Sequence, residues 1–526
     1  MMESACLRHT EIPHTTPLFS DFQYHFDRLA RFYAHNPHDP SAYAAAAKAV
    51  EYPAERRAAL VEALRSRNAA SESLKLLSKP GTMAVVTGQQ VGLFSGPAYT
   101  IYKALTAVRL AERLSEQGMP TVPIFWLATE DHDLAEVSQS FVFGADQRPV
   151  GLTANGLGAS ERPVGEIAIA DPPLGRLHDV LAGLPYADDV LEMVRDTYRP
   201  GATFGAAFHA LLERLLAGRG LLFVDPLQDA VHHLAAPLLR DVVSRDDDLH
   251  RLLLDRNGEL EAAGYHAQVH VEPKTSLVFL LEGGRRIALR RHNGEYVSKE
   301  RRYSAAELLD RIEDLSPNAL LRPVMQDYVL PTVAYVGGPS ELAYMAQSQV
   351  LYRELLGRMP VMLSRAGFTL LDARAAKLMD RYEFSLPDVF HGEERVRDQI
   401  GGKLVPPELI REFGAIERAT ADSLARLRDD LVSFDSTLAA AADKSRTKIL
   451  YQLSKIERKT ARETVRKNQR GAEEAAYLSG LIFPEKHLQE RLYSILPFVA
   501  KHGPGLMDTL YENISLDCPD HRVLVI

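Results

Sequence analysis

The sequence predicts an α/β fold with a parallel sheet, and three observations lead to it. A short apolar run from Met83 to Val86 is typical of a buried parallel strand, because both faces of such a strand are covered. A glycine-containing loop and apolar residues at helical spacing follow this run. A second apolar run, from Val122 to Ala128, comes about one helix and one turn later. This is the order of a βαβ unit, so we expect both strands to end at one edge of the sheet.

The loop after the first strand contains Gly88, Gly92 and Gly96, and Pro97 then begins the helix. Glycine lets backbone amides approach a ligand, and a helix N-terminus favours negative charge. The glycine spacing matches neither the dinucleotide pattern nor the phosphate loop, and a tight turn that packs the helix onto the sheet also explains it. Polar side chains at the end of the strand favour a ligand site, since open α/β sheets bind ligands there. They are Thr87, Gln89, Gln90 and Ser95.

Four consecutive ionisable residues follow the second strand: Glu130, Asp131, His132 and Asp133. Carboxylates beside an imidazole can act as a general base, an amine anchor or metal ligands. Capping of a helix explains one acid but not four such residues in a row. Adjacent residues do not converge easily on one ion and no HExxH-type helical pair exists, so we expect no metal. We predict that this cluster faces the first loop across one pocket.

A second turn of the same kind follows the apolar run from Val333 to Val336. Gly337 and Gly338 permit close backbone approach, and Ser340 and Glu341 open the next helix. Tyr335 and Glu341 are candidates for the pocket wall. The run from Pro360 to Ser364 predicts a further strand that ends in Arg365. Arg365 either holds a substrate carboxylate by a bidentate pair or makes an ordinary ion pair.

Other segments predict the remaining parts of the core. The run from Gly220 to Pro226 predicts another buried strand, and the alternation from His266 to Arg290, with a turn at Gly283–Gly284, predicts a hairpin. We expect a core over 1–395 that includes N-terminal helices and two insertions, at about 146–215 and about 250–300. Coiled-coil helices follow over 396–475, and 476–526 returns to the core.

A heptad seam marks the long helices. Apolar residues alternate steps of three and four from Leu424 to Ala441, and the seam resumes from Ile449 to Thr460. A dimer and an intramolecular helical hairpin both satisfy this pattern. Ten Lys or Arg residues against two acids between Lys444 and Arg470 form either a solvated helix face or a phosphate contact.

Composition limits the class of protein. The chain has 526 residues, 46% hydrophobic and 25% charged, which predicts a soluble globular protein of two or three domains. Its only cysteines, Cys6 and Cys518, lie near opposite ends, so we expect no disulfide framework and a reducing cytoplasm. No export signal and no apolar span of 18 residues occurs, so we expect no membrane contact. A net charge of −9 disfavours nucleic acid as a partner.

The motifs TGQQVGLFSGPAYTIYKA (87–104) and PIFWLATEDHDLAEV (123–137) resemble the bacillithiol-synthesis cysteine ligase family, BshC. Later stretches of the chain, LRPVMQDY (321–328) and GLIFPEKHLQER (480–491), are similar as well, so the resemblance covers nearly the whole length. It implies a Rossmann-like core similar to class I nucleotidyltransferases, with connecting insertions and a coiled coil that forms a homodimer. The synthetase signatures H-x-G-H and K-M-S-K-S are absent, which puts adenylation of cysteine in doubt.

The resemblance also implies an activity: cysteine is joined to the amino group of glucosaminyl-malate, as the last step of bacillithiol synthesis. Other hypotheses are a coiled-coil scaffold that binds a metabolite or nucleotide without turnover, and a nucleotidyltransferase that acts on another small molecule. Family members are associated with an adenine nucleotide, ATP or ADP, near the C-terminal segment. The resemblance therefore makes Tyr477, Ser479, Gly480 and Arg491 candidates for binding this cofactor.

The hypothesis for the site assigns roles to these residues. His132, helped by Asp131 or Asp133 and beside Glu130, deprotonates the attacking amine, which must be neutral to react. Lys103 or Arg365 holds the malate carboxylate. The substrate-binding candidates are Thr87, Gly88, Gln89, Gln90, Ser95, Gly96, Tyr99, Lys103, Tyr335, Gly337, Glu341 and Arg365.

Overall fold

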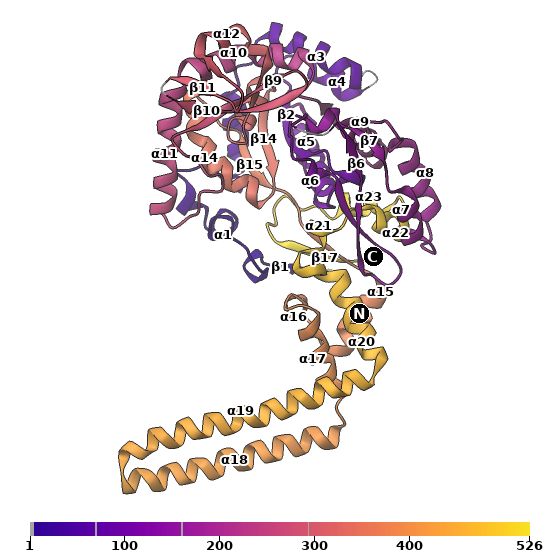
Figure 1. Cartoon of the computed structure of the whole chain (residues 1–526), viewed down its shortest axis with the longest axis vertical. Helices are drawn as coiled ribbons and strands as arrows, with labels where there is room; N and C mark the ends of the chain where they lie inside the picture. The colour runs from indigo at the N-terminus through magenta and orange to yellow at the C-terminus, as the bar shows by residue number, and fades with distance from the viewer. Residues whose placement is uncertain (1–4, 69–70, 159–160, 293) are drawn as a thin grey trace.

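The core of the globular part is a five-stranded parallel sheet in the order β15-β14-β2-β3-β8. Strands β2, β14 and β15 of this sheet are labelled in Figure 1. The computed structural model describes residues 5–68, 71–158, 161–292 and 294–526 of the chain. The strands of the sheet are β2 (Met83–Gln90), β3 (Thr121–Ala128), β8 (Leu222–Val224), β14 (Thr332–Gly337) and β15 (Val361–Ser364). The predicted strands, and with them the parallel α/β fold, are confirmed.

Strands β2 and β3 pair in register over their whole length, from Met83 opposite Thr121 to Gln90 opposite Ala128. Strand β2 is longer than expected, so residues 87–90 form the end of the strand instead of a loop. A 3-10 turn (Leu93–Ser95) then leads into α5 (Tyr99–Glu116). As the βαβ order predicts, the polar ends of both strands lie at one edge of the sheet.

Helices from the N-terminal part of the chain and from a later part of the core surround the parallel sheet. The N-terminal part consists of β1 (Ala5–Leu7), α1 (Pro17–Tyr24), α2 (Ser41–Lys48), α3 (Ala54–Asn68) and α4 (Glu72–Leu77), with 3-10 turns at His9–Glu11 and Phe26–Leu29. Later helices of the core are α10 (Asp229–Ser244), α11 (Asp246–Ala262), α13 (Arg322–Val329) and α14 (Pro339–Leu356). The N-cap of α14 is Gly338, and Ser340 lies inside the helix.

The first insertion follows β3 and contains two small hairpins and a group of helices. Its elements are α6 (Leu134–Val137), β4 (Gln139–Phe143), β5 (Pro149–Thr153), β6 (Asn155–Leu157), a 3-10 turn (Val164–Glu166), β7 (Ala168–Asp171), α7 (Leu174–Leu181), α8 (Ala187–Thr197) and α9 (Phe204–Leu215). Strand β4 pairs with β5, and β6 pairs with β7.

The second insertion is an antiparallel sheet in the order β12-β11-β10-β9-β13. Its elements are β9 (Thr275–Glu282), β10 (Arg285–His292), β11 (Glu295–Val297), β12 (Arg302–Ser304), α12 (Ala305–Asp310), a 3-10 turn (Ile312–Asp314) and β13 (Leu315–Pro317). The predicted hairpin at Gly283–Gly284 joins β9 to β10 and is confirmed. The sheet extends to residue 317, beyond the expected limit near 300, because β13 returns to pair with β9.

The C-terminal part begins at β16 (Phe368–Leu371) and returns to the core after a long helical excursion. It contains α15 (Ala373–Tyr382), α16 (Leu386–Val389), α17 (Glu393–Leu404), α18 (Pro407–Phe434), α19 (Ser436–Lys467), α20 (Gln469–Ile482), a 3-10 turn (Pro484–Lys486), α21 (Gln489–Leu492), α22 (Leu496–His502), α23 (Leu506–Glu512) and β17 (His521–Val525). Strand β17 lies between β1 and β16 in a small three-stranded sheet. Cys6 of β1 and Cys518 thereby come together, although they lie near opposite ends of the sequence.

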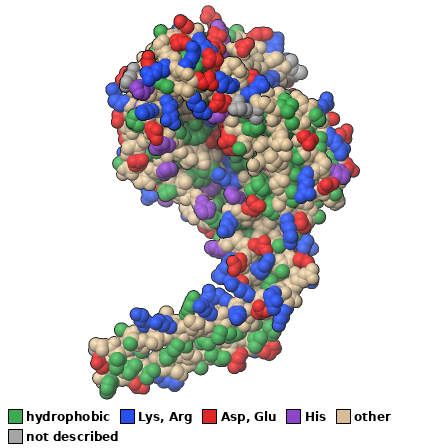
Figure 2. Space-filling model, in the orientation of Figure 1, with side chains coloured by type: hydrophobic (Ala, Val, Ile, Leu, Met, Phe, Trp, Pro, Cys, Tyr) green, Lys and Arg blue, Asp and Glu red, His purple; other side chains and the backbone are tan. Residues whose placement is uncertain are grey.

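Helices α18 and α19 form an antiparallel hairpin that projects from the globular part as an arm (Figure 1). The hairpin is one of the two arrangements that the heptad pattern allows. Many apolar side chains of the arm remain exposed, and they form a green strip along it in Figure 2. Phe434, at the tip, is 85% exposed. In the part of the chain that the structure describes, no helix is long and apolar enough to cross a membrane.

One buried ion pair fastens the returning segment to the core. Arg365, just after β15, donates from Nη1 to Glu490 Oε2 at 3.0 Å and from Nη2 to Glu490 Oε1 at 2.6 Å. Glu490 also accepts a hydrogen bond from the backbone N–H of Phe368 at 3.0 Å. Both charged side chains are nearly inaccessible to solvent. The predicted bidentate partner of Arg365 is therefore a carboxylate of the protein itself.

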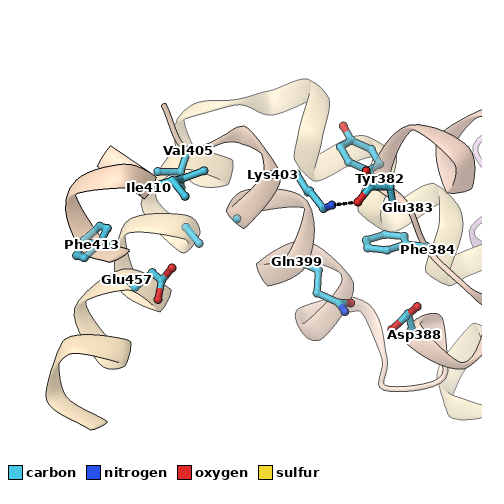
Figure 3. Close-up of a pocket in the computed structure, with 12 residues that line it drawn as sticks. Tyr382, Glu383, Phe384, Asp388, Gln399, Lys403, Val405, Ile410, Phe413 and Glu457 are labelled. Carbon is cyan, nitrogen blue, oxygen red and sulfur yellow. Dashed lines mark hydrogen bonds and ion pairs between the residues drawn. The ribbon is translucent and has the colours of Figure 1, made fainter. Parts of the chain in front are cut away.

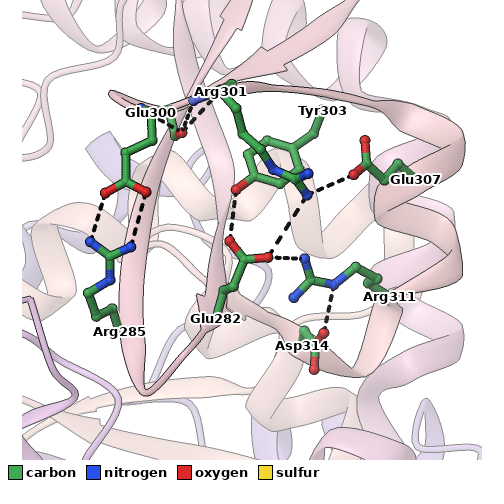
Figure 4. A network of polar contacts seen from close by, with 9 residues as sticks. Glu282, Arg285, Glu300, Arg301, Tyr303, Glu307, Arg311 and Asp314 are labelled. Carbon is green, nitrogen blue, oxygen red and sulfur yellow. Dashed lines mark hydrogen bonds and ion pairs between the residues drawn. The ribbon is translucent and has the colours of Figure 1, made fainter.

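We predict that Glu490→Ala lowers the free energy of unfolding by about 3–5 kcal/mol, because it leaves the Arg365 charge buried and unpaired. Urea unfolding measures this change. Glu300→Ala is the matched control, since Glu300 makes a similar bidentate pair with Arg285 on the exposed surface of the second insertion (Figure 4). Solvent replaces that contact, so the control variant should unfold as the wild type does. Equal losses in both variants would contradict the assignment.

Candidate functional site

A cavity of about 720 Å³ lies at the carboxyl edge of the parallel sheet. Its walls come from the ends of β2 and β3, the start of α14, and strands β9 and β10 of the second insertion. Gly88 permits the tight packing of β2 on β3 here, because a Cβ atom at this position would lie 2.8 Å from the carbonyl oxygen of Trp126. The site is therefore built between the core sheet and an insertion.

The cavity brings together many of the predicted site residues. Those that line it are Gly88, Gln89, Gln90, Tyr99, Lys103, Glu130, Asp131, His132, Glu341, Arg365 and Arg491. The polar end of β2 and the polar cluster after β3 thus face one pocket.

Several predicted residues lie elsewhere. Thr87 points along the sheet, where its hydroxyl donates to the carbonyl oxygen of Val336 at 2.8 Å. Ser95 and Gly96 form the buried turn before α5, where both have positive φ angles. Asp133 caps α6 by accepting from the N–H of Glu136 at 3.1 Å, so the capping explanation holds for this acid. None of the four lines the cavity.

Tyr335 and Gly337 support the wall from behind without lining it. The Tyr335 hydroxyl donates to Glu341 Oε1 at 2.7 Å, and the N–H of Gly338 donates to Glu341 Oε2 at 2.8 Å. Lys103 also forms an ion pair with Glu341. These contacts fix the Glu341 carboxylate at the start of α14.

Lys103 is therefore not a free carboxylate anchor. Besides its ion pair with Glu341, it donates to the carbonyl oxygen of Gly88 at 3.0 Å and to Gln89 Oε1 at 2.9 Å. Burial lowers the pKa of Lys103, and the Glu341 charge opposes that shift. Like Arg365, Lys103 is paired with a carboxylate of the protein. Neither of the two predicted anchors is therefore left unpaired for a carboxylate of the substrate.

Three other cations in the cavity have neither an ion pair nor a side-chain hydrogen bond within the part of the chain described, whereas Arg286 and Arg322 are held by hydrogen bonds. Lys274, Arg290 and Arg491 make no ion pair with any residue that the structure describes. Lysine and arginine side chains bind carboxylates and phosphates, so these positions suit an anionic ligand. Sequence reasoning missed Lys274 and Arg290, because they lie in a hairpin far along the chain from the glycine loop.

Gln90 links the two strand ends. Its side-chain amide donates to Asp131 Oδ2 and to Glu136 Oε2, both at 2.7 Å. Asp131 Oδ1 accepts from the backbone N–H of His132 at 2.7 Å. Burial alone would raise the pKa of Asp131, but these hydrogen bonds and the nearby Arg286 charge bring it below its ordinary value. Asp131 is thus held as a carboxylate.

The pKa of Glu130 is shifted in the opposite direction to that of Asp131. It is 4% exposed, and burial raises its pKa although His232 and Arg286 act against the shift. Its Oε1 atom lies 3.6 Å from His232 Nε2, too far for a hydrogen bond. Trp126 also lines the cavity, and its indole N–H is buried without a partner in the part of the chain described. A buried carboxylate and a free donor are typical of groups that meet a ligand.

Trp126 and Arg286 were not recognised from the sequence. Trp126 lies within the apolar run of β3, where an aromatic side chain indicates only a buried strand. Arg286 lies on β10 and donates from Nη1 to His132 Nδ1 at 3.2 Å across 154 positions of the chain. Only the fold of the second insertion brings it to the site.

The four predicted cofactor-binding residues do not form one site. The Tyr477 hydroxyl bonds Asp372, and the carbonyl oxygen of Gly480 accepts from Tyr493 at 2.6 Å. Ser479 is buried beside them, and only Arg491 reaches the cavity. A Cβ atom at position 480 would lie 2.3 Å from the carbonyl oxygen of Gln147, which marks close packing instead of an open cradle.

A separate cavity of about 380 Å³ lies at the base of the arm, between α17 and α18 (Figure 3). It is lined by apolar side chains such as Phe384, Val405 and Phe413, and by the Lys403–Glu383 ion pair. None of the predicted site residues lies there. Among the residues that the structure describes, no group of three or more His, Cys, Asp or Glu side chains could hold a metal ion.

Neighbouring carboxyl groups in the large cavity should respond to pH in opposite directions. The folded protein raises the pKa of Glu130, so it binds more protons than the unfolded chain from about the ordinary value of 4.5 up to the raised one. Stability is therefore lost as the pH rises through that interval. The lowered pKa of Asp131 instead adds stability above its ordinary value of 3.8, which is lost as the pH falls through the folded-state pKa.

We predict that Glu130→Gln stabilises the protein near neutral pH and that the gain disappears in acid. Asp131→Asn should be less stable than wild type near neutral pH, because it removes a favourably bound charge. Urea unfolding as a function of pH measures both differences. The same sign for the two variants would show that the carboxyl groups are not held as described.

Comparison with known proteins bears on the whole chain. A family model described as "Bacillithiol biosynthesis BshC, N-terminal Rossmann-like domain" matches residues 2–366. A second, described as "Bacillithiol biosynthesis BshC, C-terminal coiled-coil domain", matches residues 368–526. The Rossmann-like core and the coiled coil are thus both present.

Similar proteins share one name, "Putative cysteine ligase BshC". The protein from Solibacter usitatus is 54% identical over 525 residues, which is 100% of both chains. Those from Koribacter versatilis and Salinibacter ruber are 37% and 32% identical and cover 99% and 96% of each chain. The relatives are named as ligases, and with both family models matched end to end, this chain belongs to the BshC family of bacillithiol biosynthesis.

Proposed function

We propose that the protein joins cysteine to the amino group of glucosaminyl-malate, the last step of bacillithiol synthesis. The observation that carries the proposal is the large cavity, where a buried carboxyl group, Glu130, and unpaired cations line one space. An amine that attacks a carboxyl carbon needs a proton acceptor, and a malate group needs cations. The names of the relatives support the same reaction type.

The chemistry requires a neutral amine and an activated carboxyl group. A group from Glu130, Asp131 and His132 accepts the proton of the amine as it attacks. A free carboxylate does not condense with an amine in water, so cysteine reacts as an activated acyl group. The residues 477–480 are packed and do not fit a nucleotide as a set, so the proposal for ATP or ADP rests on the family resemblance alone.

The malate part of the substrate is proposed to lie against Lys274, Arg290 and Arg491. These side chains are free to bind carboxylates, whereas Lys103 and Arg365 are already paired. The excess of cations also attracts an anionic substrate into the cavity.

We further propose that the protein is a homodimer through its arm. Ten large apolar residues of α18 and α19 are between 37% and 85% exposed, and a two-helix hairpin alone leaves them in water. They are Leu409, Ile410, Ile416, Leu427, Val432, Phe434, Leu438, Ile449, Tyr451 and Ile456. An exposed apolar strip of this length is typical of an interaction surface, and the heptad pattern suits a second helical pair.

The ligation is tested with purified protein, glucosaminyl-malate and cysteine, with and without ATP or ADP, by mass spectrometry of the thiol product. We expect bacillithiol from the wild type. Arg290→Ala should raise KM for the malate substrate about tenfold with a small change in kcat, because it removes a binding charge. The matched control is Arg446→Ala on the exposed face of α19, which should behave as wild type. No product under any condition, or release of a nucleotide product without thiol, would overturn the proposed reaction.

The dimer is tested by light scattering after size-exclusion chromatography. Leu427→Asp combined with Phe434→Asp should give monomers, because charges replace apolar contacts in the proposed interface. Arg446→Asp, on the basic face of α19, should remain dimeric. A wild-type protein that is monomeric at micromolar concentration would contradict the proposal.

A further inference from the structure

Arg286 is held in a fixed position beside the cluster that follows β3. It donates from Nε to Ser316 Oγ at 3.0 Å and from Nη2 to the carbonyl oxygen of Pro317 at 2.7 Å. Its guanidinium group lies over the ring of Phe279, with Cζ 3.9 Å from the ring centroid. The residue is 8% exposed. These contacts leave one direction for the remaining donor group, Nη1.

Nη1 of Arg286 faces Nδ1 of His132 at 3.2 Å. Arginine has only donor groups and stays protonated in proteins, so the nitrogen that it faces must offer a lone pair. An imidazole whose Nδ1 accepts a hydrogen bond is neutral and carries its proton on Nε2. A ring turned by half a rotation would place a C–H group against the guanidinium N–H and lose the bond.

The other neighbours of His132 agree with this protonation state. Asp131 Oδ1 lies 3.8 Å from Nδ1, which is beyond hydrogen-bond distance, and it accepts instead from the backbone of residues 132 and 133. The remaining close ring is Phe279, which offers no acceptor. Nε2 has no hydrogen-bond partner among the residues described, while His132 lines the cavity. A free N–H donor is thus available to a ligand.

We propose that Arg286 holds His132 as the neutral Nε2–H form, so that His132 donates a hydrogen bond to the substrate instead of acting as the general base. The inference rests on the proposed ligation for the identity of the acceptor, which is the carbonyl oxygen of the activated cysteine. Negative charge develops on that oxygen as the amine attacks, and a preorganised donor stabilises it. Arg286 is a positioning residue in this scheme.

The proton of the amine then has another acceptor. Glu130 lines the same cavity with an oxygen that has no partner in the described part of the chain. In the proposed step the amine nitrogen bonds to the acyl carbon of a mixed anhydride of cysteine and a phosphate group. The bond from that carbon to the phosphate oxygen breaks, the phosphate leaves with the electron pair, and Glu130 takes the proton from nitrogen. His132 keeps its proton throughout.

The protonation state can be measured without any turnover. Protein labelled with ¹⁵N in its 18 histidines gives long-range ¹H–¹⁵N correlations that distinguish the two neutral forms. The signals that vanish in His132→Gln belong to His132. We expect a protonated Nε2 and an unprotonated Nδ1. A protonated Nδ1, or an imidazolium near neutral pH, would overturn the proposal.

Arg286 is tested by the same signals. Arg286→Met should release His132 into a mixture of both neutral forms, whereas Arg286→Lys, which keeps a donor, should retain the Nε2–H form at least in part. Intrinsic fluorescence of Trp126, the only tryptophan in the chain, reports whether the cavity is intact in each variant. If Arg286→Met does not fold, the wild-type His132 signals still decide the protonation state. Unchanged His132 signals in a folded Arg286→Met variant would show that Arg286 does not set its protonation.

Measurements of kcat in two His132 variants distinguish a hydrogen-bond donor from a general base at this position. His132→Gln retains an N–H donor but cannot take up a proton, and His132→Phe has neither property. We expect His132→Phe to lose about 10²–10³-fold in kcat and His132→Gln to recover most of that loss. Equal losses in both variants would restore the role of base to His132. If the wild type forms no thiol product, the proposed ligation fails, and the NMR result still decides the state of His132.

Discussion

The parallel pairing of β2 with β3 is the constraint on which the site depends. The two strands stay in register over eight residues, so the amide groups of Gln89 and Gln90 and the acids after β3 reach the same edge of the sheet. Gly88 permits this pairing, because a side chain there would collide with the backbone of Trp126. The pairing of β2 with β3 therefore determines where the polar groups at the two strand ends lie.

The cations around the cavity fall into two groups, those paired with a carboxylate of the protein and those without such a partner among the described residues. Lys103 and Arg365 are each neutralised by an internal carboxylate, so they fix α14 and the C-terminal segment in place. Lys274 and Arg290, by contrast, come from the antiparallel insertion and meet no such partner among the described residues. The cations of the core thus hold parts of the protein together, and the cations of the insertion are available to bind a ligand.

Much of the fold follows from local patterns, and less of the site does. The strands at Val122–Ala128 and Val333–Val336 and the hairpin at Gly283–Gly284 were predictable, because apolar runs and glycine turns act over a few residues. The polar cluster after β3 was predictable as a group, but Asp133 turned out to cap a helix. Thr87 and Ser95 were wrong as cavity residues, since alternation along the strand and a left-handed turn direct them into the interior. Arg286 could not be predicted, because its proximity to His132 depends on how a distant hairpin packs.

The order of strands in the small sheet has a consequence for synthesis of the protein. Strand β17 is the middle strand, yet the ribosome makes it after both of its neighbours and after the entire arm. Until β17 is made, β1 and β16 have unpaired edges. Glu490 is also synthesised late, so until then the charge of Arg365 has no carboxylate partner. Until this region has been translated, the nascent core therefore has an open strand edge and an uncompensated charge, and unpaired edges of this kind are prone to aggregation.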